Sequence, residues 1–156
     1  QEAICLFKYE GKISLAAPLA HLMINRLPPL DAIDVIIPVP LHPERLRERE
    51  FNQSLLLADR IGRHLNIPVS GTALIRTAPA PPQTTLSRKE RLNNLRGAFA
   101  VPRPESVAGK RILLIDDEPF SQQIIEHGLR TCVKHVLRYE SSPKRAAELA
   151  LEIVTR

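Results

Sequence analysis

Apolar positions along the chain switch between helical and strand-like spacing. From Ile13 to Leu27 they recur every three or four residues, which predicts a first helix with Pro18 near its start. A β-branched run between prolines, residues 34–40, predicts a strand. Amphipathic spacing over residues 54–65 predicts a second helix, and we expect residues 41–53 to form a loop between the two.

Three further apolar runs predict strands. Residues 66–77 contain a brief one, residues 97–101 another, and residues 111–116 form a continuous apolar run too short for a lone helix. A final amphipathic helix is expected from Ser142, with Pro143 at its first position. Because strands alternate with helices, the pattern predicts an α/β fold with a mostly parallel sheet.

One long segment does not fit this alternation. Residues 77–96 are polar and rich in proline, and they lack strand periodicity. Loops of this length within a compact domain often bind ligands, although a plain surface linker has the same composition. Both interpretations stay open at this point.

Length and composition limit the classes of protein to consider. A chain of 156 residues, 44% hydrophobic and 25% charged, fits one domain over residues 1–156. No apolar run approaches the roughly 20 residues that span a bilayer, so no membrane insertion is expected. The net charge of +5 favours phosphates or nucleic acid as partners, and two cysteines suit a reducing cytoplasm. Because the chain opens on Gln1, we expect some N-terminal sequence to be missing.

Two adjacent carboxylates, Asp116 and Asp117, follow the apolar run of residues 111–115. Ligands of parallel-sheet proteins usually bind at the carboxyl ends of the strands. The pair could hold a metal, accept hydrogen bonds from sugar hydroxyls, or begin a turn. Adjacent strand residues point to opposite faces, so only one carboxylate faces a given side unless the strand has already ended.

Two other segments combine basic and amide side chains. Residues 40–54 carry three arginines and then Asn52 and Gln53 beside a predicted helix start, which suits an oxyanion such as pyrophosphate. Three glutamates among them also fit an exposed, charged turn. Residues 76–99 could close over an anionic substrate or contact a nucleic-acid backbone. Only 4% of residues are aromatic, which argues against a base-stacking platform.

Four runs in order resemble the competence protein F (ComF-like) family, which is related to phosphoribosyltransferases: FKYEG, DVIIPVPLHPERLREREFNQS, LIRTAPAPPQTTLSRKERLNNLRGAF and GKRILLIDD. They extend from Phe7 to Asp117. The resemblance implies a type I phosphoribosyltransferase fold, with a mostly parallel central sheet, flanking helices and a flexible loop or hood. It also implies phosphoribosyl pyrophosphate (PRPP) or a related phosphorylated sugar as ligand, Mg²⁺ bound through PRPP, and a link to DNA uptake in natural competence.

The resemblance also assigns roles by position. Asp116 and Asp117 would be the catalytic pair that contacts the ribose, with a possible share in holding Mg²⁺. The other substrate-binding positions fall in two groups. Arg45, Arg49, Asn52 and Gln53 would lie near the pyrophosphate, and Arg76, Thr77, Gln83, Arg91 and Asn94 would belong to the mobile loop.

The sequence departs from the family pattern in two places. Glu50 replaces a usual glycine, which adds negative charge near the proposed anion site and loses glycine's backbone freedom. After Asp117 the family continues with a Thr-Thr-Gly phosphate loop, whereas this chain has Glu118 and Pro119, which repel phosphate and remove a backbone donor. Residues 118–156 are therefore either the product of a shifted reading frame or a tail that has diverged from the family.

Two functions follow from these expectations. The first is an enzyme that transfers a glycosyl group from PRPP with Mg²⁺. The second is a non-catalytic module of the same fold, without the phosphate loop, that binds single-stranded DNA or a competence helicase.

Overall fold

A computed structural model describes residues 6–7, 10–25, 27, 33–78, 98–116 and, for the backbone, 135–140. In chain order its helices and strands are the 3-10 helix η1 (Ile13–Leu15), α2 (Ala16–Ile24), β1 (Val35–Pro38), α3 (Pro43–Arg49), α4 (Gln53–Leu65), β2 (Ile75–Arg76), β3 (Phe99–Ala100), the 3-10 helix η3 (Pro104–Ser106), β4 (Arg111–Asp116) and β5 (His135–Glu140). The predicted final helix lies outside the described residues.

The central sheet is parallel, with strand order β1-β4-β5. β1 pairs with β4 from Val35 opposite Ile112 to Pro38 opposite Ile115, and β4 pairs with β5 along its whole length. β2 and β3 form a separate antiparallel pair. The expected mostly parallel α/β sheet is confirmed, and its carboxyl ends meet at one edge.

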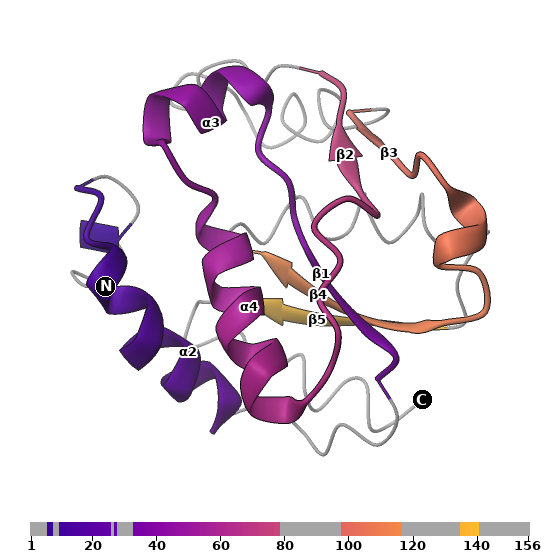
Figure 1. Ribbon diagram of the computed structural model, residues 1–156, viewed down its shortest axis with the longest axis horizontal. Helices are drawn as coiled ribbons and strands as arrows, with labels where there is room; N and C mark the ends of the chain where they lie inside the picture. The colour runs from indigo at the N-terminus through magenta and orange to yellow at the C-terminus, as the bar shows by residue number, and fades with distance from the viewer. Residues whose placement is uncertain are drawn as a thin grey trace.

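Both faces of this sheet are covered. Ile36, Leu113 and Ile115 point to the face on which α2 and α4 pack. Ile37, Ile112 and Leu114 point to the opposite face, where the chain of β2 and β3 covers them. Figure 1 shows α2 and α4 on one side of the sheet and the β2–β3 pair on the other. Burial of both faces explains why the two predicted strands are continuous apolar runs instead of alternating ones.

The first helix is confirmed with different bounds. A 3-10 turn precedes it, and α2 ends at Ile24 rather than Leu27. Pro18 is the third residue of α2, in the first turn, where its missing N–H has no intrahelical acceptor to lose. Within the described part of the chain, none of the helices is both long and apolar enough to span a membrane.

The expected loop of residues 41–53 was wrong in part, because it contains helix α3. Pro43 occupies the first position, and the Nδ1 atom of His42 accepts a hydrogen bond from the Glu44 N–H at 3.4 Å. Glu44 lies in the first turn and Arg47 and Arg49 in the last, which suits the helix dipole. These start and stop signals outweigh the absence of an apolar face in so short a helix.

At Gly62, helix α4 lies very close to the segment that follows the helix, residues 67–69. A Cβ atom added there would lie 2.5 Å from Val69 Cγ2 and 2.7 Å from the Ile67 carbonyl oxygen. Asn66 ends the helix with φ 55°, and the Ile67 N–H donates to the Gly62 carbonyl at 2.9 Å. The returning chain then bridges β1 at Ile36 through Val69. Glycine at position 62 therefore lets α4 dock against the sheet.

The amino ends of β1 and β4 are joined by Asp34 and Arg111. The Asp34 N–H donates to the Arg111 carbonyl at 2.9 Å, and Asp34 Oδ2 accepts the Arg111 N–H at 2.7 Å and its Nε at 3.4 Å. Both side chains are 41% exposed. The backbone N–H of Arg111, helped by its guanidinium, holds the pKa of Asp34 below its ordinary value of 3.8.

Candidate ligand-binding edge of the sheet

The predicted carboxylate Asp116 is the last residue of β4 and is only 2% exposed. Alternation along the strand places it on the same face as Ile112 and Leu114. It therefore stands at the carboxyl edge of a parallel sheet, where ligands of such folds bind. Asp117 lies outside the described residues, so joint action of the two carboxylates stays a prediction.

Val39, just past the end of β1, connects this carboxylate's strand to helix α4. Its N–H donates to the Ile115 carbonyl at 2.9 Å, and its carbonyl accepts the Asn52 Nδ2 amide at 3.1 Å. Asn52 Oδ1 in turn accepts the Leu55 N–H at 3.3 Å and so caps α4. One asparagine thus fixes both the start of the helix and its attachment to the strand end.

Gln53 and Arg49 lie at the same helix start. Gln53 is the first residue of α4 and is 1% exposed. Arg49 Nη1 lies 3.5 Å from Gln53 Oε1, at the outer limit of a hydrogen bond. The guanidinium therefore stands beside the positive end of the α4 dipole, where backbone N–H groups favour an anion. The structure brings together three of the four residues predicted near the pyrophosphate.

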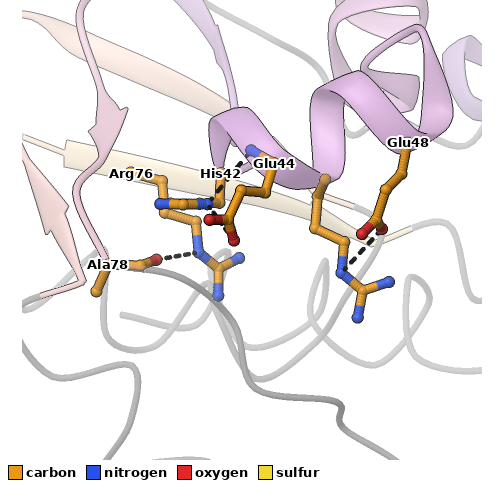
Figure 2. Close-up of polar contacts among 6 residues, drawn as sticks. His42, Glu44, Glu48, Arg76 and Ala78 are labelled. Atoms are coloured by element: carbon orange, nitrogen blue, oxygen red, sulfur yellow. Dashed lines mark hydrogen bonds and ion pairs between the residues drawn. The ribbon is translucent and has the colours of Figure 1, made fainter.

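Arg45, the fourth, takes part in an exposed ion pair on α3. Its Nε lies 3.9 Å from Glu48 Oε2, and the two side chains are 36% and 65% exposed. His42 Nδ1 and Glu44 Oε2 lie 3.6 Å apart (Figure 2). The stretch 43–50 holds three arginines and three glutamates, so those side chains add no net charge. For Arg45, the alternative of a charged surface segment with weak ion pairs describes the geometry better.

Glu50 ends α3 in the left-handed region, with φ 63° and ψ −14°. Residues other than glycine are strained there, because Cβ crowds the neighbouring carbonyl. The backbone at this position therefore adopts a conformation that favours glycine, although a glutamate occupies it. The carboxylate is also exposed, one residue from Arg49.

Arg76 and Thr77 belong to a different element, the β2–β3 pair. Arg76 Nε donates to the Ala78 carbonyl at 3.2 Å, and its guanidinium carbon lies 5.3 Å from the centre of the Phe99 ring. The Thr77 N–H donates to the Ala98 carbonyl at 2.8 Å. Gln83, Arg91 and Asn94, predicted to act with them, lie outside the described residues.

The carboxylate of Asp116 is the kind of oxygen ligand that a cation such as Mg²⁺ could use. Among the described residues, there is no group of three His, Cys, Asp or Glu side chains that could hold a metal by itself. Mg²⁺ usually keeps several waters and binds through one or two carboxylates together with substrate phosphates. Asp116 is a residue at this edge that could supply such a carboxylate.

The sequence pattern did not single out the backbone of Val39 or the Asp34–Arg111 pair. Asn52 was singled out for anion binding, whereas its position directly before an amphipathic helix is also the usual signal of an N-cap. The strand β5 was missed as well. Its pairing with β4 is a contact between distant parts of the chain, and residues 135–140 have no continuous apolar run.

Comparison with known proteins identifies relatives of this chain. No family model matches the chain. It is 34% identical over 119 residues to competence protein F of Haemophilus influenzae, covering 71% of this chain and 52% of that protein. It is 32% identical over 116 residues to DNA utilization protein YhgH of Escherichia coli strain K12, covering 70% and 50%. The chain therefore spans about half the length of the curated relatives it matches.

A solved structure supports the fold. Glutamine PRPP amidotransferase from B. subtilis, complexed with ADP and GMP, superposes with a TM-score of 0.53 at 22% identity, covering 83% of this chain and 27% of that one. At this identity the likeness concerns architecture alone. With the parallel sheet and the relatives together, the chain belongs to the competence protein F family and has a type I phosphoribosyltransferase fold.

Proposed function

We propose that this protein binds PRPP or a related phosphorylated sugar, with Mg²⁺, at the carboxyl edge of its sheet, and that it serves DNA uptake. The observation that carries the proposal is the buried Asp116, joined through Ile115 and Val39 to the capped start of α4. A carboxylate for sugar hydroxyls thus stands near a helix start that favours phosphate oxygens. The names of the two curated relatives support the role in DNA use.

Asp116 and the start of α4 have different parts in this proposal. Asp116 accepts hydrogen bonds from the ribose hydroxyls and orients the sugar. The α4 start, with Arg49 beside it, faces the pyrophosphate and stabilises the charge that grows as it departs. Glycosyl transfer then follows from positioning and charge stabilisation, without a covalent step on the protein. Binding is the first part of the proposal and transfer the second, because residues 118–122, Glu-Pro-Phe-Ser-Gln, do not contain the family's Thr-Thr-Gly phosphate loop.

Isothermal titration calorimetry with PRPP and Mg²⁺ tests the binding. We expect affinity in the micromolar range, weakened at least about tenfold in Asp116→Asn, which keeps the side-chain volume and removes the charge. Glu105→Gln, which neutralises an exposed carboxylate on η3, is the matched control and should bind as the unchanged protein does. No heat of binding at millimolar PRPP would remove PRPP as the ligand.

The second candidate is a non-catalytic module for single-stranded DNA or a competence helicase. The net charge of +5 and the relative named for DNA utilization favour it. Fluorescence anisotropy with a labelled oligonucleotide should then show binding that weakens with salt and is lost when Arg88, Lys89 and Arg91 are replaced together. If the oligonucleotide does not bind even at low salt, this candidate is wrong.

A further inference from the structure

We propose that Arg76 is a positioning residue, which clamps β2 to β3 through the Phe99 ring, and not a residue that contacts the phosphorylated ligand. We call the β2–β3 pair, together with its flanking residues Thr77, Ala78 and Ala98, the neck. The inference rests on the proposed function for its ligand, but the clamp itself is a property of the neck that can be measured without ligand.

Arg76 makes two contacts with other residues of the neck. Arg76 and Phe99 are direct cross-strand partners, and the guanidinium carbon lies 5.3 Å from the ring centre, within the roughly 6 Å of a cation–π contact. Arg76 Nε also donates to the Ala78 carbonyl at 3.2 Å. Figure 2 shows the side chain folded back toward Ala78. Two contacts of different kinds therefore set the orientation of the guanidinium plane.

A pair of two-residue strands needs such support. Isolated two-stranded pairs are marginally stable in water, and β2 and β3 have two residues each. Beyond the strands, the Thr77 N–H continues the pairing to the Ala98 carbonyl at 2.8 Å. Arg76 thus stabilises the point where the chain leaves the neck after Ala78 and the point where it returns at Ala98.

The neck is coupled to the candidate edge through Phe99. This ring packs against the core cluster that includes Val39 and Leu114. Val39 holds the Asn52 side chain, and Leu114 precedes Asp116 by two residues on the same face of β4. A shift of the ring would therefore change the packing under both parts of the proposed binding edge.

Conservative variants separate a clamp from a direct ligand contact. Arg76→Lys keeps the positive charge but loses the planar group and its Nε donor, whereas Phe99→Leu removes the ring and leaves Arg76 in place. Phe99→Tyr keeps an aromatic face and serves as the rescue variant. Arg103→Lys, on an exposed arginine, is the matched control. Two quantities are measured below the melting temperature of every variant: amide hydrogen exchange at Thr77, and the affinity for PRPP with Mg²⁺.

For a clamp, Arg76→Lys and Phe99→Leu should each speed exchange at Thr77 about tenfold and weaken PRPP binding about tenfold. The double variant should weaken binding by less than the two single effects combined, because both variants lose the stacking of the guanidinium plane on the Phe99 ring. Phe99→Tyr and Arg103→Lys should resemble the unchanged protein in both measurements.

Other results overturn the inference. If Phe99→Leu binds PRPP normally while Arg76→Lys does not, Arg76 contacts the ligand directly. If exchange at Thr77 is unchanged in both variants, no clamp exists. If the unchanged protein does not bind PRPP, the proposed ligand is wrong, and Thr77 exchange alone decides whether Arg76 clamps the neck.

Discussion

The two edges of the central sheet each carry an aspartate, and the two residues have opposite surroundings. At the amino edge, the Asp34 side chain is 41% exposed and accepts two hydrogen bonds from Arg111, its neighbour across the strands. At the carboxyl edge, Asp116 is the last residue of β4 and is only 2% exposed. Asp34 helps to hold the register of the two strands, whereas Asp116 lies at the strand ends where ligands of parallel-sheet proteins usually bind.

This difference shows that a carboxylate at a strand end is not by itself a site. What distinguishes the carboxyl edge is the second structure attached to it, namely helix α4, whose start is bound to the strand end through Asn52 and Val39. The amino edge has an ion pair instead, which holds strands together. Substitutions that disturb one edge at a time separate these two roles.

The largest expected effect is at the carboxyl edge, in Asn52→Ala. The change removes the cap of α4 and leaves the Val39 carbonyl without its amide donor, and together these losses cost about 2–3 kcal/mol of unfolding free energy. Urea denaturation measures it. Asn52→Asp is the matched variant, because its carboxylate can still accept the Leu55 N–H but cannot donate to Val39. If both variants unfold as the unchanged protein does, α4 is not anchored as described.

A smaller effect is expected where α4 docks against the amino half of β1, in Gly62→Ala. The added Cβ would lie 2.7 Å from the Ile67 carbonyl oxygen, a backbone atom that cannot move away alone, so we expect a loss of about 2 kcal/mol. Gly71→Ala is the control, since its Cβ would meet only Leu55 Cδ1 at 3.5 Å, an ordinary contact. Thermal unfolding of both variants checks this. Equal melting temperatures would contradict the close approach.

The smallest effect is at the amino edge, and it depends on pH. Because the folded pKa of Asp34 is below the unfolded value, its charge stabilises the fold above the unfolded pKa, and this contribution is lost as the pH falls through the folded pKa. Asp34→Asn should thus be slightly less stable than the unchanged protein at about pH 6, and the gap should close toward about pH 2.5. Denaturation across this range, with Glu105→Gln for comparison, measures it. A gap that widens in acid would have the wrong sign.

The strands β1 and β4 could be predicted from sequence because burial of both faces gives a continuous apolar run, and the helix α4 because burial of one face gives apolar residues at helical spacing. Helix α3 has little apolar periodicity, and its only signals are the proline at its start and the charges at its ends. The strand β5 depends on pairing with β4, which no local pattern encodes. The parts of the fold that depend on pairing between distant segments therefore could not be predicted from local sequence patterns.

The site was predictable to the same extent. Asp116 was singled out because it directly follows an apolar run, and Gln53 because its amide lies beside the start of a predicted amphipathic helix. The bond from Asn52 to Val39 joins a side chain to a backbone carbonyl thirteen residues away, and it exists only once β1 and α4 have packed. Arg76 has the charge expected of an anion ligand, yet its cross-strand partner Phe99 becomes apparent only when β2 and β3 are paired.

The Asp34–Arg111 pair has a consequence for insertions and deletions in β4. This strand has six residues, with Arg111 at one end tied to Asp34 and Asp116 at the other. Removing one residue between them would move the carboxylate to the opposite face of the sheet, toward α2 and α4, because side chains alternate along a strand. Removing two would restore the face and draw the carboxylate back by about 7 Å. The number of residues in β4 therefore sets both the face of the sheet on which Asp116 lies and how far along the strand it lies. Deletions of one residue should change the face, whereas deletions of two should change only the position.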